Sequence, residues 1–305
     1  MSTAKASVTA NLVTAVPATA QATIPSKPNL PTSFRELYVE QRDRISVITF
    51  NRPEVRNALT RRGYNELIGA LRDATFNDAI TTVVLTGADG CFTAGNDLTQ
   101  LRQYPNANAF FHSSNFVLGL LVKAFIYCPK VLVAVVDGPC VGIGFVLAAL
   151  CDVVYCTQRA FFQAPFTQLG ICAEGGATYL LPQLLGRAKA SELLLFGTRM
   201  SAEDALNFNF VARIVPWAEL EHQLWPQLEK YARLPVESLQ ATKRLLNKPV
   251  VEQLLIALQA ECQELEQLRK GETYQNAIKE FMKRKEGENC ENKSKFCLWD
   301  AKQDQ

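Results

Sequence analysis

Between residues 44 and 156 short apolar runs alternate with longer amphipathic ones, and this alternation constrains the fold more than any other feature of the sequence. Residues 44–50 alternate between apolar and polar with a period of two, which is typical of a half-buried strand. Residues 57–76 instead carry apolar side chains at helical spacing. The runs 82–87 and 131–136 are short and mainly apolar, as buried strands are. Repeated strand–helix units of this kind predict an α/β fold in which helices cover the sheets.

The rest of the pattern supplies the other expected elements. Residues 116–127 and 143–150 predict helices, and residues 152–156 predict a further strand. After Ser201 the pattern is almost wholly helical, and it ends in an amphipathic run over residues 250–285. An apolar stripe follows one side of that run through Leu254, Leu255, Leu258, Cys262, Leu265 and Leu268.

Both ends of the chain lack a persistent helical or strand period. Residues 1–33 are rich in Ala, Thr, Val, Ser and Pro and contain no acidic residue, which predicts a disordered leader. A transit peptide would be rich in Arg, and this segment has none. Residues 286–305 are dominated by charged residues and Asn and predict a flexible tail. No run reaches the roughly 18 apolar residues of a membrane-spanning helix, so we expect a soluble protein.

The charge balance and the cysteines exclude several classes of protein. A net charge of +2 provides no basic stripe for nucleic acid. The nine cysteines are an odd number and contain no Cys-x-x-Cys pair, and the chain has only two histidines, so we expect no metal site. Most of the cysteines lie in apolar runs, where they would pack as small hydrophobes. An intracellular, reducing compartment is therefore expected.

Two loops that follow predicted strands are rich in small residues. One is Phe92–Leu98, with Ala94-Gly95-Asn96 at its centre, and the other is Asp137–Gly144, which ends in Gly142-Ile143-Gly144. Small residues let a ligand approach the backbone, and unpaired N–H groups at the start of a helix bind negative oxygens. Tight turns would need the same glycines, so neither loop identifies a site by itself. A dinucleotide fingerprint is incomplete, because Leu147 stands where its third glycine would be.

A third segment, residues 165–178, contains a single acidic residue, Glu174, among apolar residues and glycines. A carboxylate in apolar surroundings has its pKa raised toward neutral pH, which suits a general base. The alternative is a carboxylate that stabilises the N-terminus of the helix that follows. The residues by themselves leave both interpretations open.

The three segments, in this order and spacing, resemble the crotonase (enoyl-CoA hydratase/isomerase) superfamily. The resemblance covers roughly residues 34–285 and includes Asn51-Arg52-Pro53 followed by Asn57-Ala58-Leu59. It implies a spiral core of repeated ββα units over residues 34–230 and a C-terminal helical region over residues 231–285. Within the superfamily the sequence is most similar to the peroxisomal-type Δ3,Δ2-enoyl-CoA isomerases of fatty acid oxidation.

The resemblance assigns chemical roles to individual residues. The backbone N–H groups of Asn96 and Ile143 would form an oxyanion hole for the thioester oxygen. The two glutamates that hydratases use would stand at Val146 and Phe166, so hydration is disfavoured. Glu174 matches the single glutamate of the isomerases. It would move a proton from C2 to C4 of a 3-enoyl-CoA and so give the trans-2-enoyl-CoA.

The resemblance also points to residues around the substrate. Asn115 would orient the base or the substrate, although an Asn near a helix start often serves only as a cap. The backbone that would contact the substrate belongs to Ala58, Leu59, Ala94, Gly95 and Gly142. Arg52 or Arg56 would either contact a phosphate of coenzyme A or remain solvated. No metal and no separate cofactor is implied, because coenzyme A is part of the substrate.

The expected partner is an acyl-CoA thioester, and the resemblance implies a homotrimer formed through the C-terminal helices. A helix packed inside one chain would show the same amphipathic run. The resemblance implies a peroxisomal protein, but the sequence ends without a Ser-Lys-Leu type address, so a mitochondrial location stays open. Two alternatives to isomerisation remain: a non-catalytic acyl-CoA-binding or scaffold protein, and another crotonase reaction such as thioester hydrolysis.

Overall fold

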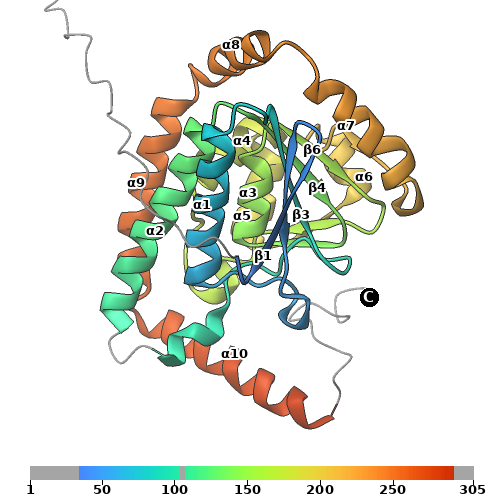
Figure 1. Cartoon of the computed structure of the whole chain (residues 1–305). Helices are drawn as coiled ribbons and strands as arrows, with labels where there is room; N and C mark the ends of the chain where they lie inside the picture. Colours follow the sequence, from blue (N-terminus) through green and yellow to red (C-terminus); the bar gives the residue numbers. More distant parts are fainter. Residues whose placement is uncertain (1–33, 104–106, 292–305) are drawn as a thin grey trace, which may run out of the picture. The chain divides into compact units, whose positions relative to one another are not determined.

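The computed structural model of the 305-residue chain describes residues 34–103 and 107–291 (Figure 1). The predicted leader over residues 1–33 and residues 292–305 of the predicted tail lie outside the described residues. The last helix, α10, covers Glu272–Glu291 and so continues past residue 286, where the tail was expected to begin.

The larger of two sheets has six strands in the spatial order β1-β2-β3-β4-β6-β9. The strands are β1 (Leu37–Arg42), β2 (Ile45–Phe50), β3 (Thr82–Gly87), β4 (Val131–Val136), β6 (Val153–Cys156) and β9 (Arg213–Ile214). β1 and β2 pair antiparallel, and the other neighbours run parallel. The strands predicted over residues 82–87 and 131–136 are confirmed at both ends.

Side chains that alternate along the central strands separate two apolar cores. Along β4, Leu132, Ala134 and Val136 belong to the main core, whereas Val133 and Val135 belong to a smaller core on the opposite face. The period-two geometry of a strand produces this division. Because both faces are apolar, the sheet is covered on both sides, as parallel sheets are.

The smaller sheet has three short strands, β5 (Pro139–Val141), β7 (Phe161–Gln163) and β8 (Arg199–Ser201). β7 lies parallel to β5 and antiparallel to β8. The ring of Phe162 in β7 packs against Phe145 and Phe210, with centroids 5.5 and 5.0 Å away. Phe145 belongs to α3 (Ile143–Ala149), so this aromatic cluster fixes α3 against the smaller sheet.

Helices α1 (Arg61–Phe76), α2 (Ala107–Tyr127) and α9 (Val251–Leu268) lie side by side over the main core (Figure 1). α4 (Ala177–Leu185) contacts both α3 and α9, and α7 (Trp225–Ala232) covers the smaller core. The other helices are α5 (Arg187–Phe196), α6 (Ala202–Asn207) and α8 (Val236–Asn247), and the short turns are η1 (Pro53–Val55), η2 (Leu98–Gln103), η3 (Thr167–Leu169), η4 (Trp217–Glu219) and η5 (Leu220–Leu224). None of the helices in the described ranges is both long and apolar enough to cross a membrane.

Two elements near the N-terminus differ from the sequence prediction. α1 begins at Arg61 and not at residue 57, because the Thr60 hydroxyl accepts hydrogen bonds from the N–H groups of Arg62 and Gly63 at 3.0 and 3.2 Å and so caps the helix. β1 was not predicted, since its apolar residues stop after Val39 and its second half, Glu40-Gln41-Arg42, is polar, as suits a strand at the edge of a sheet.

The amphipathic run over residues 250–285 forms two helices, α9 and α10, and not one. α9 ends at Leu268, and the N–H of Gly271 turns back to the carbonyl of Leu268 at 3.0 Å. Leu254, Leu258 and Leu265 are buried as the stripe predicts, whereas Leu268 is 39% exposed. Apolar periodicity runs through both helices, so it did not reveal the break between them.

The cysteines in the described part of the chain form no disulfide with one another. Four of them are buried in the core, in agreement with the expectation of small apolar side chains: Cys91, Cys128, Cys140 and Cys156. Burial raises the pKa of the Cys156 thiol to about 12, so this sulfur is a thiol at neutral pH.

Candidate active site

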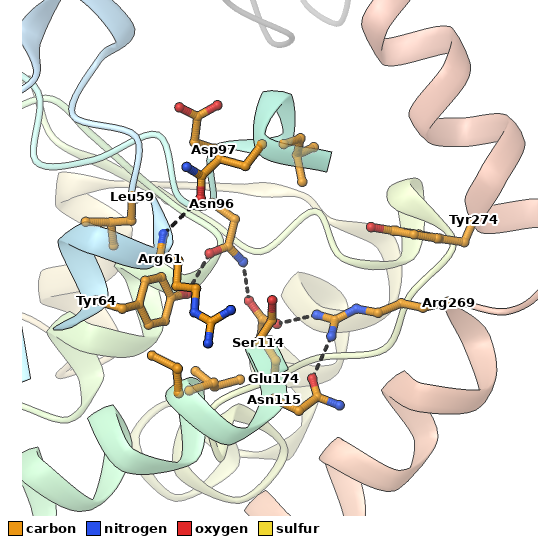
Figure 2. A pocket seen from close by; sticks show the side chains of 14 residues that line it. Leu59, Arg61, Tyr64, Asn96, Asp97, Ser114, Asn115, Glu174, Arg269 and Tyr274 are labelled. Carbon is orange, nitrogen blue, oxygen red and sulfur yellow. Dashed lines mark hydrogen bonds and ion pairs between the residues drawn. The ribbon is translucent and has the colours of Figure 1, made fainter. Parts of the chain in front are cut away.

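A solvent-open cavity lies where α1, α2 and the end of α9 meet (Figure 2). Segments far apart in the sequence contribute to its wall, which combines apolar with polar side chains. The lining consists of Leu59, Arg61, Tyr64, Asn96, Asp97, Leu98, Gln100, Ser114, Asn115, Val117, Leu118, Glu174, Arg269 and Tyr274.

Backbone hydrogen bonds join the two small-residue loops to each other beside this cavity. The N–H of Thr93 donates to Pro139 at 3.1 Å, and the N–H of Val141 donates to Thr93 at 3.0 Å. A second pair of bonds joins the first loop to the segment before α1, since Leu59 donates to Gly95 at 2.8 Å and accepts from Asp97 at 2.9 Å. The three segments therefore form one continuous backbone scaffold.

Glycine is required where these two loops meet. Gly95 has φ +88°, and a Cβ placed on it would lie 2.8 Å from the carbonyl oxygen of Val141. Gly142 has φ +59°, and the nearest neighbour of a Cβ there would be the Cα of Gly95 at 3.9 Å. Side chains are disfavoured at both positions, because a positive φ is readily adopted only by glycine. The close approach brings the next residue of each loop, Asn96 and Ile143, to the same place.

The backbone N–H groups of Asn96 and Ile143 donate to no acceptor within residues 34–103 and 107–291. Leu59 pairs with the residues on either side of Asn96, which leaves the Asn96 N–H outside that pairing. Ile143 is the first residue of α3, and the first N–H groups of a helix have no partner within the helix. Two neighbouring unused donors of this kind can stabilise a developing oxyanion.

Glu174 is the acidic group of the site, and its residue is only 1% exposed. Its Oε1 accepts from the Asn96 amide at 2.8 Å, and its Oε2 accepts from the Arg269 guanidinium at 3.2 Å. Burial raises the pKa of the Glu174 carboxyl above its ordinary value, while Arg269 and the Asn96 amide oppose that rise. A carboxylate shifted in this direction is a stronger base than an exposed one.

The turn that carries Glu174 is held against the second loop. A Cβ on Gly175 would lie 3.1 Å from Cδ1 of Ile143 and 3.0 Å from Cγ1 of Val146. Glu174 therefore adjoins both residues whose N–H groups are unused: it is bonded to the side chain of Asn96 and its turn contacts Ile143. The structure thus brings Asn96, Ile143 and Glu174 together, and their chemical roles stay a prediction.

The carboxylate at the N-terminus of α4 is Glu261, not Glu174. Glu261, from α9, accepts from the N–H of Gly176 at 2.6 Å, the N–H of Thr178 at 2.8 Å and the hydroxyl of Thr178 at 2.6 Å. The capping role that competed for Glu174 is thus performed by another residue. Sequence reasoning missed Glu261, although it is a charged residue within an otherwise apolar side of α9.

Tyr64 fixes the orientation of the Asn96 amide. The Tyr64 hydroxyl donates to Oδ1 of Asn96 at 2.6 Å, which leaves the amide nitrogen to donate to Glu174. Burial raises the pKa of Tyr64 well above its ordinary value, so its hydroxyl remains a proton donor. Asn96 therefore supports the base through its side chain and offers its backbone N–H to the same cavity.

Asn115 lines the cavity but does not bond to Glu174. Its Oδ1 accepts from the Arg269 guanidinium at 2.6 Å, and its amide donates to the carbonyl of Cys262 at 3.2 Å. Asn115 thus contacts Glu174 only indirectly: it accepts a hydrogen bond from Arg269, and Arg269 donates another to Glu174 (Figure 2). Sequence reasoning missed Arg269, whose signal was a cation four residues beyond Leu265 on the buried side of α9.

The other predicted substrate-contacting residues lie in the supporting loops. Leu59 is part of the cavity lining, whereas Ala58, Ala94, Gly95 and Gly142 are not. Ile143 also lies outside the lining and adjoins the site through its backbone and its contact with the Glu174 turn. The positions discussed for hydratase acids are buried apolar side chains, Val146 and Phe166.

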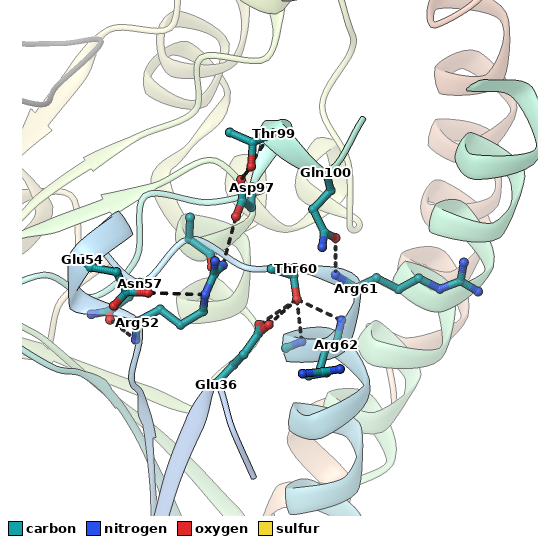
Figure 3. A network of polar contacts seen from close by, with 12 residues as sticks. Glu36, Arg52, Glu54, Asn57, Thr60, Arg61, Arg62, Asp97, Thr99 and Gln100 are labelled. Carbon is teal, nitrogen blue, oxygen red and sulfur yellow. Dashed lines mark hydrogen bonds and ion pairs between the residues drawn. The ribbon is translucent and has the colours of Figure 1, made fainter. Parts of the chain in front are cut away.

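Arg52 is used within the scaffold, as Figure 3 shows. Its guanidinium donates to the carbonyl of Ala58 at 2.7 Å and to Asp97 at 3.1 Å. Asp97 also accepts hydrogen bonds from the N–H and hydroxyl of Thr99 at 3.1 and 2.6 Å. Asp97 is the second carboxylate in the cavity wall, and these bonds hold it within the scaffold. Arg61, not Arg52 or Arg56, is the arginine of this segment that lines the cavity.

The fold and this site define a crotonase-fold protein. Its structure resembles that of an enoyl-CoA hydratase/isomerase from Pseudoalteromonas atlantica with a TM-score of 0.74 and 29% identity, over 82% of this chain and 98% of that one. An enoyl-CoA hydratase from Mycobacterium avium subsp. paratuberculosis gives a TM-score of 0.75 at 27% identity, over 83% of this chain and 97% of that one. These matches confirm the predicted fold class.

The sequence matches the enoyl-CoA hydratase/isomerase family over residues 40–289, and the chain belongs to that family. Among its relatives, enoyl-CoA delta isomerase 2 of Rattus norvegicus is 39% identical over 79% of this chain. That match covers 62% of the rat protein, so the chain spans less than two thirds of this relative's length. The peroxisomal enoyl-CoA delta isomerase 3 of Mus musculus is 34% identical over 82% of this chain and 79% of its own length.

Proposed function

We propose that this protein is a Δ3,Δ2-enoyl-CoA isomerase that converts 3-enoyl-CoA into trans-2-enoyl-CoA in fatty acid oxidation. The Glu174 carboxylate takes a proton from C2, which the thioester acidifies. The electron pair left on C2 delocalises over the double bond and the carbonyl oxygen. Protonated Glu174 then returns the proton at C4, the carbonyl re-forms, and the double bond stands between C2 and C3. No electron leaves or enters, so the reaction needs no redox cofactor.

The observation that carries the proposal is one buried carboxylate beside two unused N–H donors. Glu174 serves as the base at both carbons, and the N–H groups of Asn96 and Ile143 stabilise the enolate oxygen. One such donor contributes roughly 2.7–4 kcal/mol to transition-state stabilisation in other enzymes. Leu59 lines the cavity proposed for the coenzyme A thioester, and Ala58, Ala94, Gly95 and Gly142 belong to the backbone that supports it.

The lack of acids at positions 146 and 166 supports isomerisation over hydration. Addition of water across a double bond requires a group that activates the water as well as one that supplies a proton. Val146 and Phe166 are buried hydrocarbons and do neither. Asp97, the other acid in the cavity wall, is bonded to Arg52 and Thr99.

The decisive experiment follows the conversion of 3-hexenoyl-CoA by the absorbance of the conjugated 2-enoyl thioester. We expect turnover by the wild-type protein and a loss of about 10²–10⁴-fold in Glu174→Gln, the usual contribution of a general base. Glu266→Gln is the matched control, because Glu266 is a half-exposed residue of α9 that pairs with Lys270.

Other products would overturn the proposal in distinguishable ways. Free coenzyme A would indicate thioester hydrolysis, and 3-hydroxyacyl-CoA would indicate hydration. Binding of the thioester with no turnover over a series of chain lengths would indicate a non-catalytic acyl-CoA-binding protein. Assembly as a homotrimer and location in a peroxisome or a mitochondrion belong to the same proposal, and sedimentation and fluorescence microscopy of the tagged chain test them.

A further inference from the structure

Arg269 forms a buried ion pair with the proposed base. Its side chain is 8% exposed and that of Glu174 is 1% exposed, and the two are separated by 95 positions in the sequence. One guanidinium nitrogen, Nη2, donates to Glu174 at 3.2 Å, and the other, Nη1, donates to Asn115 at 2.6 Å. The planar guanidinium therefore spans the space between α2 and the Glu174 turn.

The geometry of α9 explains how Arg269 reaches the site. Leu254, Leu258, Glu261, Leu265 and Arg269 are spaced by three or four residues, so they share one side of the helix and its C-terminal cap, and all five are buried. α9 thereby contacts the base from two directions. Glu261 holds the backbone that follows Glu174, and Arg269 holds the carboxylate itself.

We propose that Arg269 is a positioning residue that orients the Glu174 carboxylate and supplies the positive charge that keeps it ionised for proton abstraction. This inference rests on the proposed function and adds a residue to it. Breaking a buried pair by removing one partner leaves the other charge uncompensated. A carboxylate left in that state takes up a proton, and a protonated Glu174 cannot act as the base.

Other charged and titratable groups face Glu174 from each neighbouring element. They are Tyr64 of α1, Cys172 of its own loop, Glu261 and Cys262 of α9, and Tyr274 of α10. The tyrosines and cysteines have raised pKa values, about 11 for Cys172 and about 12 for Tyr274, because they are buried. Glu261 is the other acid, and its bonds to Gly176 and Thr178 hold it in a separate site. Arg61 of α1 and Asp97 also line the cavity, and Asp97 is bonded to Arg52 and Thr99. Among the described residues, Arg269 is the cation that donates a hydrogen bond to Glu174.

The first test measures kcat/KM for 3-hexenoyl-CoA as a function of pH. Activity rises with pH as Glu174 loses its proton, so a higher pKa moves this acidic limb to higher pH. We expect Arg269→Gln to move the limb upward by about 1–3 pH units, the usual effect of an adjacent arginine on a carboxyl group. Arg269→Lys keeps the positive charge, so its acidic limb should stay close to that of the wild type.

Lys270→Gln is the matched control, because it removes a positive charge one residue away. Lys270 is 46% exposed at its side chain and pairs with Glu266 on the surface, so the acidic limb should stay where it is in the wild type. Glu261→Gln tests the neighbouring acid: it removes a nearby negative charge, so any movement of the limb should be to lower pH, opposite to that of Arg269→Gln. An Arg269→Gln variant that loses activity equally at every pH would overturn the proposal and indicate a purely structural role.

A second measurement does not depend on turnover. Protein labelled with ¹³C at glutamate carboxyl carbons is titrated by NMR, and the signal missing from Glu174→Gln identifies the base. Its titration midpoint should rise in Arg269→Gln, and an unchanged midpoint overturns the inference. If the wild type fails to isomerise the substrate, the proposed function fails while this titration still decides the role of Arg269.

If Arg269→Gln does not fold, Asn115→Ala makes the same test. This change removes the second hydrogen bond of the guanidinium without touching Glu174. Because Arg269 is then held less firmly, the acidic limb and the NMR midpoint should both move to higher pH. The shift should be smaller than the one expected for Arg269→Gln. An unchanged midpoint in a folded Asn115→Ala protein, with an unchanged limb, would contradict the proposal.

Discussion

At the scale of single residues, Asn96 takes part in both proposed functions of the site, proton transfer by Glu174 and stabilisation of the enolate oxygen. Its side chain donates to Glu174, Tyr64 fixes its amide, and its backbone N–H faces no acceptor in the described structure. A substitution that keeps the backbone and removes the amide therefore separates the two contributions. The oxyanion donor would survive, and the hydrogen bond to the ionised base would not.

Asn96→Ala should accordingly lower kcat and move the acidic limb of the pH profile upward. The Asn96 amide lowers the pKa of Glu174, so its loss lets burial raise that pKa further. Hydrogen bonds to charged groups contribute about 1.5–3 kcal/mol, so a tenfold to hundredfold loss at neutral pH is expected. Recovery of near-wild-type turnover at alkaline pH would show that the backbone donor is intact, and a pH-independent loss would contradict this division of roles.

Cys172 lies two residues before the base but is not expected to take part in the reaction. Burial raises the pKa of its thiol to about 11, so little of the reactive thiolate is present at neutral pH. Cys172→Ser should keep wild-type turnover of 3-hexenoyl-CoA. Any inhibition of the wild type by an alkylating reagent at alkaline pH would then come from the bulk of the adduct and should be smaller in the serine variant. Loss of activity in Cys172→Ser would disprove the spectator role.

At the scale of elements, the position of the base depends on α9. Glu261 accepts three hydrogen bonds at the start of α4, directly after the Glu174-Gly175-Gly176 turn. Without it, the buried N–H of Gly176 and the partly buried N–H and hydroxyl of Thr178 lose their acceptor. The turn then gains freedom at the point where the carboxylate must be held.

Glu261→Ala should lower the free energy of unfolding by about 1–3 kcal/mol, the cost of leaving buried polar groups unsatisfied. Urea denaturation measures this change. kcat should fall as well, since the base is less well oriented. Glu264→Ala, on the exposed side of α9, is the control and should change neither quantity. A stable Glu261→Ala protein with full turnover would show that α9 does not hold the turn.

The sequence predicted elements best where local pattern decides them. β3 and β4 are buried runs whose limits coincide with their apolar residues, and α3 and β6 were placed to within one residue. α1 was predicted to begin too early, because the cap at Thr60 outweighs the helical spacing of Asn57–Leu59. The break between α9 and α10 was missed for a different reason. A turn around Gly271 interrupts the backbone while the apolar period continues.

The site was predictable in part for the same physical reason. Gly95, Gly142 and Glu174 stand in short segments whose composition singles them out, and the order of the three segments together gave the family resemblance that assigned their roles. The partners of Glu174 come from remote segments, since Arg269 is 95 positions away and Tyr64 belongs to α1. Long-range hydrogen bonds leave no period or motif in a single sequence. Only the packing of α9 and α1 around the cavity brings these residues to the base.

At the scale of the whole molecule, a partly buried ion pair ties helix α8 to the larger sheet. The ammonium of Lys243 in α8 donates to Asp152 at 2.7 Å and to the carbonyl of Lys130 at 2.8 Å. Asp152 also accepts from the N–H of Leu132, the second residue of β4, at 2.7 Å. The Lys243 ammonium therefore connects α8 with Lys130, which directly precedes β4, and with Asp152, which directly precedes β6.

Lys243→Met should lower the free energy of unfolding by about 1.5–3 kcal/mol, because it removes a hydrogen-bonded cation from the partly buried Asp152. Chemical denaturation of the two proteins measures the difference. Lys248→Met, at the end of α8, is the control for loss of a surface charge. If Lys243→Met unfolds at the wild-type denaturant concentration, the pair contributes nothing to the attachment of α8.

The bonds from Glu261 to Gly176 and Thr178 also have a kinetic consequence. Both amide protons are hydrogen-bonded to the Glu261 carboxylate, and the Gly176 proton is also buried, so we expect them to exchange with deuterated water when α9 moves away from α4. Their exchange rates should match those of the α9 backbone and not those of an ordinary surface turn. The machinery around Glu174 would then open and close as one cooperative unit with the C-terminal helix, and its lifetime would be set by the detachment of α9.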